Sequence, residues 1–111
     1  MRYRELLELI EEGENIQCEF KRKFSTQDKI AREMIAFANT KGGYIIFGVD
    51  DDKKIFGVES EKETSELVKD TALNSCEPKI DYSIEYKEID GKEIVIVWVN
   101  WTGKVRRFFR A

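Results

Sequence analysis

The run from Ile35 to Asp52, IAFANTKGGYIIFGVDDD, constrains the fold more than any other stretch, because it begins as a helix and ends as a strand. Before and within this run, Ile30, Met34 and Phe37 recur at helical spacing. A helix with this spacing buries one of its faces, so we expect it to pack against a sheet.

Two adjacent glycines, Gly42 and Gly43, follow this helix. Glycine permits a positive φ and a close backbone approach, so the chain can reverse directly into the next segment. That segment, Tyr44 to Val49, is apolar at nearly every position and does not alternate. The pattern predicts a strand that is covered on both faces and lies inside the sheet. The uniform apolar run from Ile94 to Val99 predicts a second interior strand.

The helices are predicted from apolar spacing and from the residues that begin or end them. They are a first helix from about Tyr3 that Gly13 ends, a second opened by Ser25 with Asp28, and a third opened by the capping box Ser60 with Glu63 and stopped near Ser75 before Pro78.

The remaining strands are predicted from alternation and turn signals. They are a first strand with Ile16, Cys18, Phe20 and Phe24 on one face, a return strand from Lys53 to Val58 in a hairpin with the central strand, an alternating strand from Ile80, its partner after the Asp90-Gly91 turn, and a last strand from Val105 to Phe109. The predicted fold class is α+β, with three helices on a mixed sheet of about five or six strands.

Length and composition limit the classes of function. The chain of 111 residues fits one domain over residues 1–111. Two cysteines and no histidine argue against a disulfide framework, a zinc site and histidine-based acid/base chemistry. No apolar run is long enough to cross a membrane and the N-terminal segment is charged, so we expect a cytoplasmic protein with no membrane partner. Because the net charge is −3, a nucleic-acid-binding surface would have to be a local basic patch.

The glycines do not have the order of a phosphate-binding loop. Such a loop leads from a strand into the N-terminus of a helix. Here Lys41, Gly42 and Gly43 follow the C-terminal end of a helix, whose dipole repels phosphate. ATP hydrolysis and a nucleotide cofactor are therefore disfavoured.

Carboxylates flank two of the predicted strands. Glu14 and Glu19 bracket the start of the first strand, and Asp50 to Asp52 end the central one. If the two strands are adjacent, three carboxylates could hold Mg²⁺ or Mn²⁺, which prefer oxygen ligands. Lys21 and Lys23 would then neutralise phosphate beside the metal. The alternative is that these acids are ordinary solvated residues of a helix end and a turn.

The C-terminal residues combine cations with aromatic rings and lack acids. They are Lys104, Arg106, Arg107 and Arg110 around Phe108 and Phe109, with Trp98 and Trp101 just before them. Basic residues interleaved with aromatic ones suit contacts to phosphates and bases. The alternative is an edge strand protected by positive charge.

Several short motifs occur together in one order. They are Glu14, Glu19-Phe20-Lys21, Ala36-Phe37-Ala38-Asn39-Thr40, Gly42-Gly43 and Gly48-Val49-Asp50-Asp51. In this combination the chain resembles a Schlafen AlbA-type domain, closely over roughly residues 10 to 60 and loosely beyond. The resemblance implies an α+β nucleic-acid-binding domain, which in prokaryotic proteins is often joined to a winged helix and described as a transcriptional regulator. The loop order disfavours an older description of the family as a divergent AAA-type ATP-binding domain.

Some animal Schlafens that are similar in this domain cleave transfer and ribosomal RNA in a metal-dependent reaction that uses three acidic residues. Their pattern falls here on Glu14, Glu19 and Asp51, with Lys21 as the lysine of the triplet. The resemblance therefore implies a metal-dependent endoribonuclease as an alternative function. Family members usually continue beyond the point where this chain stops, so we expect a minimal protein or a fragment of a longer one, completed by another domain or a second copy.

The function predicted from the sequence is binding of DNA or RNA with little sequence preference, since contacts to the backbone dominate such binding. The cations expected to make these contacts are Lys21, Lys23, Lys41, Arg106, Arg107 and Arg110. The competing class is a protein interaction module, such as a homodimer formed through an edge strand or the aromatic C-terminal segment.

Overall fold

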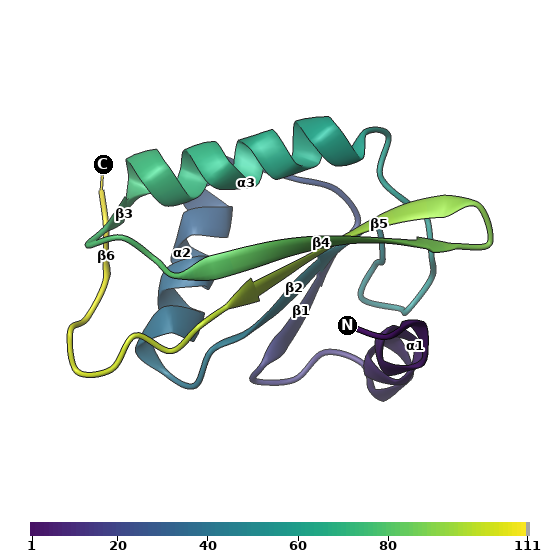
Figure 1. The fold of residues 1–111 in the computed structure, drawn as a ribbon, viewed down its shortest axis with the longest axis horizontal. Helices are drawn as coiled ribbons and strands as arrows, with labels where there is room; N and C mark the ends of the chain where they lie inside the picture. The colour runs from purple at the N-terminus through teal and green to yellow at the C-terminus, as the bar shows by residue number, and fades with distance from the viewer. Residues whose placement is uncertain (111) are drawn as a thin grey trace.

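The structure is a computed structural model that describes residues 1–110. Its elements are α1 (Tyr3–Glu12), β1 (Cys18–Lys21), α2 (Gln27–Asn39), β2 (Gly43–Phe47), α3 (Glu61–Ser75), β3 (Cys76–Glu77), β4 (Tyr82–Ile89), β5 (Lys92–Val99) and β6 (Phe108–Phe109). Figure 1 shows α2 and α3 on one side of the sheet and α1 on the other. In the described part of the chain, no helix is long and apolar enough to cross a membrane.

Four strands form the main sheet in the order β1-β2-β5-β4, and β3 pairs with β6 in a separate two-stranded sheet. β1 runs parallel to β2 and places Glu19 opposite Ile45, whereas β5 runs antiparallel to β2 and to β4. The mixed α+β fold is confirmed. The two strands with unbroken apolar runs, β2 and β5, are interior, as predicted. The first strand, β1, lies beside β2, which is the arrangement that the candidate metal site required.

Both faces of β2 are buried, because its alternate side chains enter two separate cores. Ile45 and Phe47 belong to the core under α2 and α3. Ile46 belongs to the core under α1, together with Leu6 and Ile10. A strand with two covered faces has no polar face, which explains why the sequence of β2 does not alternate.

The helix α2 packs directly against β2, where two glycines make the approach possible. Gly42 has a φ of 76°, and a Cβ atom there would stand 2.7 Å from the carbonyl oxygen of Val99. A Cβ atom on Gly43 would collide with the ring of Phe37 from α2. The chain therefore reverses at these two residues, as the sequence predicted.

Most predicted helix ends and turns are confirmed. These are the end of α1 at Gly13, the cap of α3 in which the Ser60 hydroxyl accepts from the Glu63 N–H at 3.0 Å, and the positive φ of Asp90 and Gly91 in the hairpin. The start of α2 was predicted wrongly. Its cap is Thr26 and not Ser25, because the helix begins one residue later, at Gln27: Thr26 has the extended backbone of an N-cap, and its hydroxyl accepts from the Lys29 N–H at 3.2 Å.

The predicted return strand from Lys53 to Val58 is wrong. Within this segment only Ile55 pairs with Val49, as an isolated bridge, and the Val58 N–H donates to the carbonyl oxygen of Glu93 at 2.8 Å. β1 occupies one edge of β2 and β5 occupies the other, so no edge remains for a hairpin partner.

The first strand is shorter than predicted, because its alternation does not extend to Ile16 or to Phe24. Ile16 is 77% exposed. Cys18 and Phe20 face α1, whereas Phe24 packs on the opposite core and stacks on Phe47 with 6.2 Å between ring centroids. β1 ends at Lys21 and the chain crosses the end of the sheet towards α2, so the side on which a side chain lies is no longer set by period two.

The predicted last strand, Val105 to Phe109, is reduced to the two residues of β6, and it does not join the main sheet. The segment before it is tied to α2 by Asn39, whose side chain accepts from the Arg107 N–H at 2.7 Å and donates to the Arg107 carbonyl oxygen at 3.1 Å. These side-chain bonds replace strand pairing at Arg107.

Candidate functional site

The chain after β5, residues 101–110, forms a C-terminal segment that lies along the end of α2. The backbone N–H and hydroxyl of Thr102 both donate to the carbonyl oxygen of Ala38 at 3.0 Å. Asn39 then holds the backbone of Arg107 through two hydrogen bonds. Two residues at the end of the helix therefore fix the path of a segment more than sixty positions away in the sequence.

A groove of about 480 Å³ separates this segment from α2. Within residues 1–110 its lining contains three arginines and no acidic side chain. The lining residues are Arg32, Ile35, Ala36, Asn39, Thr40, Arg106, Arg107, Phe108 and Phe109. Cations with no facing acid in an acidic chain give this groove a positive local charge, the kind of patch that the net charge conceals.

The three arginines of the groove have different surroundings. The guanidinium of Arg32 lies 4.4 Å from the ring centroid of Phe109. The guanidinium of Arg107 donates to the carbonyl oxygen of Lys79 at 2.8 and 3.0 Å and to that of Val105 at 2.7 Å, so it fastens the segment in place. Arg106 is exposed, and in the described part of the chain no acid lies within salt-bridge distance of it.

Of the other residues named from the sequence in and near the C-terminal segment, most are exposed on the surface and one packs against the sheet. Lys104 and Trp101 are exposed, and Arg110 lies 3.6 Å from Glu77 in an exposed ion pair. Trp98 packs on Tyr44 with 4.6 Å between ring centroids and donates its indole N–H to Asn100 at 2.6 Å, so it supports the sheet. Lys41 is exposed directly after Thr40, which lines the groove.

A second charged cluster forms at β1. Glu14 accepts a hydrogen bond from the Phe20 N–H at 3.0 Å. Lys21 lies with its Nζ 2.6 Å from Glu33 Oε1 and 3.9 Å from Glu19 Oε1. Glu33, on α2, was not singled out in the sequence. Its position three residues after Ile30 and four before Phe37 lies beside the buried face of the helix, and that spacing is the signal that could have found it.

Burial raises the pKa of Glu19 to about 7, and the negative charges of Glu14 and Glu33 and a hydrogen bond with Glu14 add to this effect. The positive charge of Lys21 acts in the opposite direction. Glu33 Oε2 is buried and has no hydrogen-bond partner in the described part of the structure. The cluster therefore holds more carboxylates than its single lysine neutralises.

The third predicted acid, Asp51, lies in the exposed turn after β2. Its neighbour Asp50 organises this turn, because one carboxylate oxygen accepts from the N–H groups of Asp52 at 3.0 Å and Lys54 at 2.9 Å. Among residues 1–110 no group of three or more acids, cysteines or histidines is positioned to hold a metal ion. The structure thus brings Glu14 and Glu19 together but does not assemble the predicted trio as a metal site.

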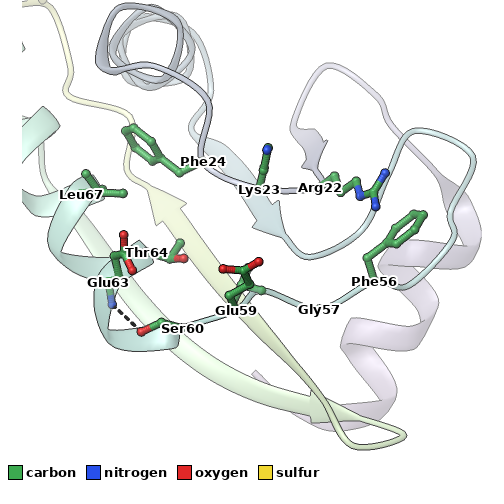
Figure 2. A pocket seen from close by; sticks show the side chains of 11 residues that line it. Arg22, Lys23, Phe24, Phe56, Gly57, Glu59, Ser60, Glu63, Thr64 and Leu67 are labelled. Carbon is green, nitrogen blue, oxygen red and sulfur yellow. Dashed lines mark hydrogen bonds between the residues drawn. The ribbon is translucent and has the colours of Figure 1, made fainter.

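A larger hollow, of about 610 Å³, lies at the N-terminus of α3. Figure 2 shows Arg22 beside Phe56 on one side and Phe24 near Leu67 on the other. The Arg22 guanidinium lies 3.8 Å from the ring centroid of Phe56, and Lys23 is exposed nearby. Glu59 and Glu63 also line the hollow and oppose these two cations. Its charges are balanced, which makes it a poorer match for a polyanion than the groove.

Comparison with known proteins identifies the fold among solved structures. The N-terminal domain of a RecG-related protein from Nitrosomonas europaea, named after ATP-dependent DNA helicases, has a TM-score of 0.74 and 23% identity over 100% of this chain and 82% of that one. The DIP2311 protein of Corynebacterium diphtheriae has a TM-score of 0.60 and 17% identity over 88% of this chain and 22% of that one. At these identities the likeness concerns the fold alone.

Sequence comparison adds a closer relative and a family. An uncharacterized ATP-binding protein of Ureaplasma parvum is 35% identical in a match that covers 76% of this chain but only 27% of that protein. The chain therefore spans well under a third of this relative. Residues 14–106 match the family described as Schlafen, AlbA_2. Because the match covers most of the chain, this protein belongs to the Schlafen, AlbA_2 family.

Proposed function

We propose that this domain binds nucleic acid with little sequence preference, through the groove between α2 and the C-terminal segment. The observation that carries the proposal is the lining of this groove, which joins three arginines to two phenylalanines without a facing acid in the described residues. Arginine guanidinium groups contact phosphates, and such contacts carry no base sequence. Of the predicted cations, Arg106 is exposed within this lining, and Lys41 and Arg110 are exposed directly after lining residues, although Arg110 is paired with Glu77.

The family and the name of a structural neighbour support the same proposal. The neighbour from Nitrosomonas europaea is named after DNA helicases, and its fold covers the whole of this chain. The name of the Ureaplasma relative refers to ATP, but this chain spans only 27% of that protein. In a longer protein or an assembly, the domain would supply general affinity for nucleic acid beside another module, as in a transcriptional regulator.

The test is a binding titration with fluorescently labelled duplex DNA, single-stranded DNA and transfer RNA at several salt concentrations. Binding that weakens as salt rises, and that weakens further in Arg106→Ala, supports the proposal. Arg4→Ala is the matched control, because Arg4 is an exposed arginine on α1, across the sheet from the groove. Absence of binding to all three ligands at low salt would remove the proposal, and so would equal losses in the two variants.

The second candidate function is metal-dependent cleavage of structured RNA such as transfer RNA by Glu14, Glu19 and Asp51, with Lys21 at the phosphate. One observation favours it. Glu14 and Glu19 are close enough that the charge of one raises the pKa of the other. Asp51 is not grouped with them in the described residues, so this candidate ranks below binding.

Two measurements on wild type and Glu19→Gln test this candidate. Addition of Mn²⁺ should raise the melting temperature of the wild type only, and transfer RNA should be cut in Mn²⁺ by the wild type only. Equal cleavage by both proteins would identify the activity as a contaminant. No Mn²⁺ effect on melting would eliminate the metal site.

The third candidate is self-association. β4 forms an outer edge of the main sheet over the eight residues Tyr82–Ile89, and its backbone groups on that side can pair with another strand. Light scattering of the purified protein distinguishes this dimer from a monomer.

A further inference from the structure

We infer that the groove selects single-stranded over duplex nucleic acid, because Phe108 offers its ring to the face of an unpaired base. This inference rests on the proposed function, since it concerns the same groove. It adds the class of nucleic acid and the side chain that distinguishes one class from the other.

The two phenylalanines of β6 have opposite roles. Phe109 packs against the core under α2 and α3 and is covered by the guanidinium of Arg32 at 4.4 Å. Phe108 lines the groove and is 62% exposed. Exposed large apolar side chains on one segment indicate a contact surface, and Trp101 and Val105 of the same segment are exposed as well.

The position of Phe108 is fixed by the segment that holds it. Asn39 bonds both backbone groups of Arg107, the preceding residue, and Glu77 pairs with Phe108 across the two-stranded sheet. The ring therefore stands on a backbone that is already ordered, and binding does not require the segment to fold.

The chemistry of the groove matches a base stacked beside a phosphate. A volume of about 480 Å³ is large enough for a group of small-molecule size. In a duplex the faces of the bases are stacked on one another, so an aromatic side chain reaches them only in a single strand or in an extruded base. Arg106, two residues before Phe108, can meet the phosphate of the same nucleotide.

The polar groups of the groove are largely occupied by the protein itself. The amide of Asn39 bonds the backbone of Arg107, and the guanidinium of Arg107 bonds the carbonyl oxygens of Lys79 and Val105. These bonds hold both side chains in place, so neither can turn to follow the edge of a base. Recognition then depends on stacking and charge, which every base and every phosphate can satisfy.

The experiment compares oligothymidylate with a DNA duplex of the same length, each labelled, in wild type, Phe108→Ala, Phe108→Trp and Arg106→Ala. The wild type should bind the single strand more tightly. Phe108→Ala should weaken single-strand binding by roughly tenfold and leave duplex binding unchanged, because only the stacked base is lost. Phe108→Trp should retain single-strand affinity, and strand binding should quench its indole emission by more than that of the wild type, which already contains Trp98 and Trp101. Arg106→Ala should weaken the binding of both the single strand and the duplex.

Leu73→Ala is the control for loss of an exposed apolar side chain, since Leu73 is 64% exposed on α3 and does not line the groove. It should bind like the wild type. Equal affinity of the wild type for both ligands, or Phe108→Ala with unchanged single-strand affinity, overturns this inference and leaves nucleic-acid binding intact. No binding of either ligand overturns both proposals.

Discussion

Lys21 and Arg106 were both predicted to contact phosphate, but they lie in opposite surroundings. The Lys21 side chain is 21% exposed, and its ammonium lies 2.6 Å from Glu33 and 3.9 Å from Glu19. Arg106 is exposed beside a groove whose described lining has no acid. A cation that already neutralises carboxylates adds little attraction for a polyanion, so the availability of a charge matters more than its presence in the sequence.

The same contrast applies to what each region does for the protein. In the β1 cluster the lysine is paired with carboxylates of the protein itself, which come from β1 and α2, and a further carboxylate comes from the loop between α1 and β1. The groove faces outward, and of its three arginines one stabilises the segment while another is free for a ligand. The first region should therefore control stability and the second should control binding.

The largest expected effect is on stability, from Lys21→Met. Removal of the ammonium leaves the carboxylates of Glu33 and Glu19 without their cation in a partly buried site. We expect a loss of about 2 kcal/mol in the free energy of unfolding, measured by urea denaturation. Arg106→Ala should change it by less than about 0.5 kcal/mol. Adding Glu33→Gln to Lys21→Met should restore part of the loss. Equal losses of unfolding free energy in Lys21→Met and Arg106→Ala would contradict the contrast between the two regions.

The next effect is on binding, from Asn39→Ala. This change removes both hydrogen bonds that hold the backbone of Arg107, so Arg106 and Phe108 lose their fixed positions. Affinity for labelled single-stranded DNA should fall by roughly three- to tenfold, which is the loss expected from about 1 kcal/mol of ordering. The control is Asn74→Ala on α3, an exposed asparagine outside the groove. Equal affinity of the two variants would show that the tether is dispensable.

A smaller effect is the pH dependence of stability caused by Glu19. Its pKa is raised from 4.5 to about 7, so the folded state holds the proton more tightly than the unfolded state does. The free energy of unfolding should therefore fall as pH rises from about 4.5 to about 7, by about 1 kcal/mol once solvent screening of this partly exposed group is included. Denaturation curves at several pH values in wild type and Glu19→Gln measure it. If the pKa of Glu19 is not raised, wild type and Glu19→Gln should show the same pH dependence of the free energy of unfolding between these pH values.

The smallest effect concerns salt. Arg106→Ala should make the slope of log K against log salt less steep by about one, because one phosphate contact is lost. Lys21→Met should leave the slope unchanged, because Lys21 is already paired. The same titration series that gives the affinities gives both slopes, and a change of slope in Lys21→Met would mean that this lysine reaches phosphate after all.

The interior of the sheet could be predicted from the sequence because burial on both faces leaves a local trace. β2 and β5 are apolar without alternation, and Gly42 and Gly43 mark the reversal between α2 and β2. These signals lie within a few residues of the element they describe, so tertiary contacts did not override them.

The parts that could not be predicted depend on partners distant in the sequence. The role of Arg107 is set by the carbonyl oxygen of Lys79, and that of Lys21 by Glu33 on another element. Phe24 packs on the core under α2 and α3, opposite to the predicted face, because β1 already ends at Lys21. In each case the sequence named the right type of side chain, and only the fold decides whether its polar group is available.

The most direct test of the central claim is to map the bound strand on the protein. Addition of unlabelled oligothymidylate to ¹⁵N-labelled protein should shift the amide NMR signals of Arg32, Ala36, Thr40, Arg106 and Phe108, while those of Glu14, Glu19 and Lys21 stay in place. Shifts confined to β1, or to Arg22 and Phe56 at the larger hollow, would contradict the claim that the groove between α2 and the C-terminal segment is the nucleic-acid interface.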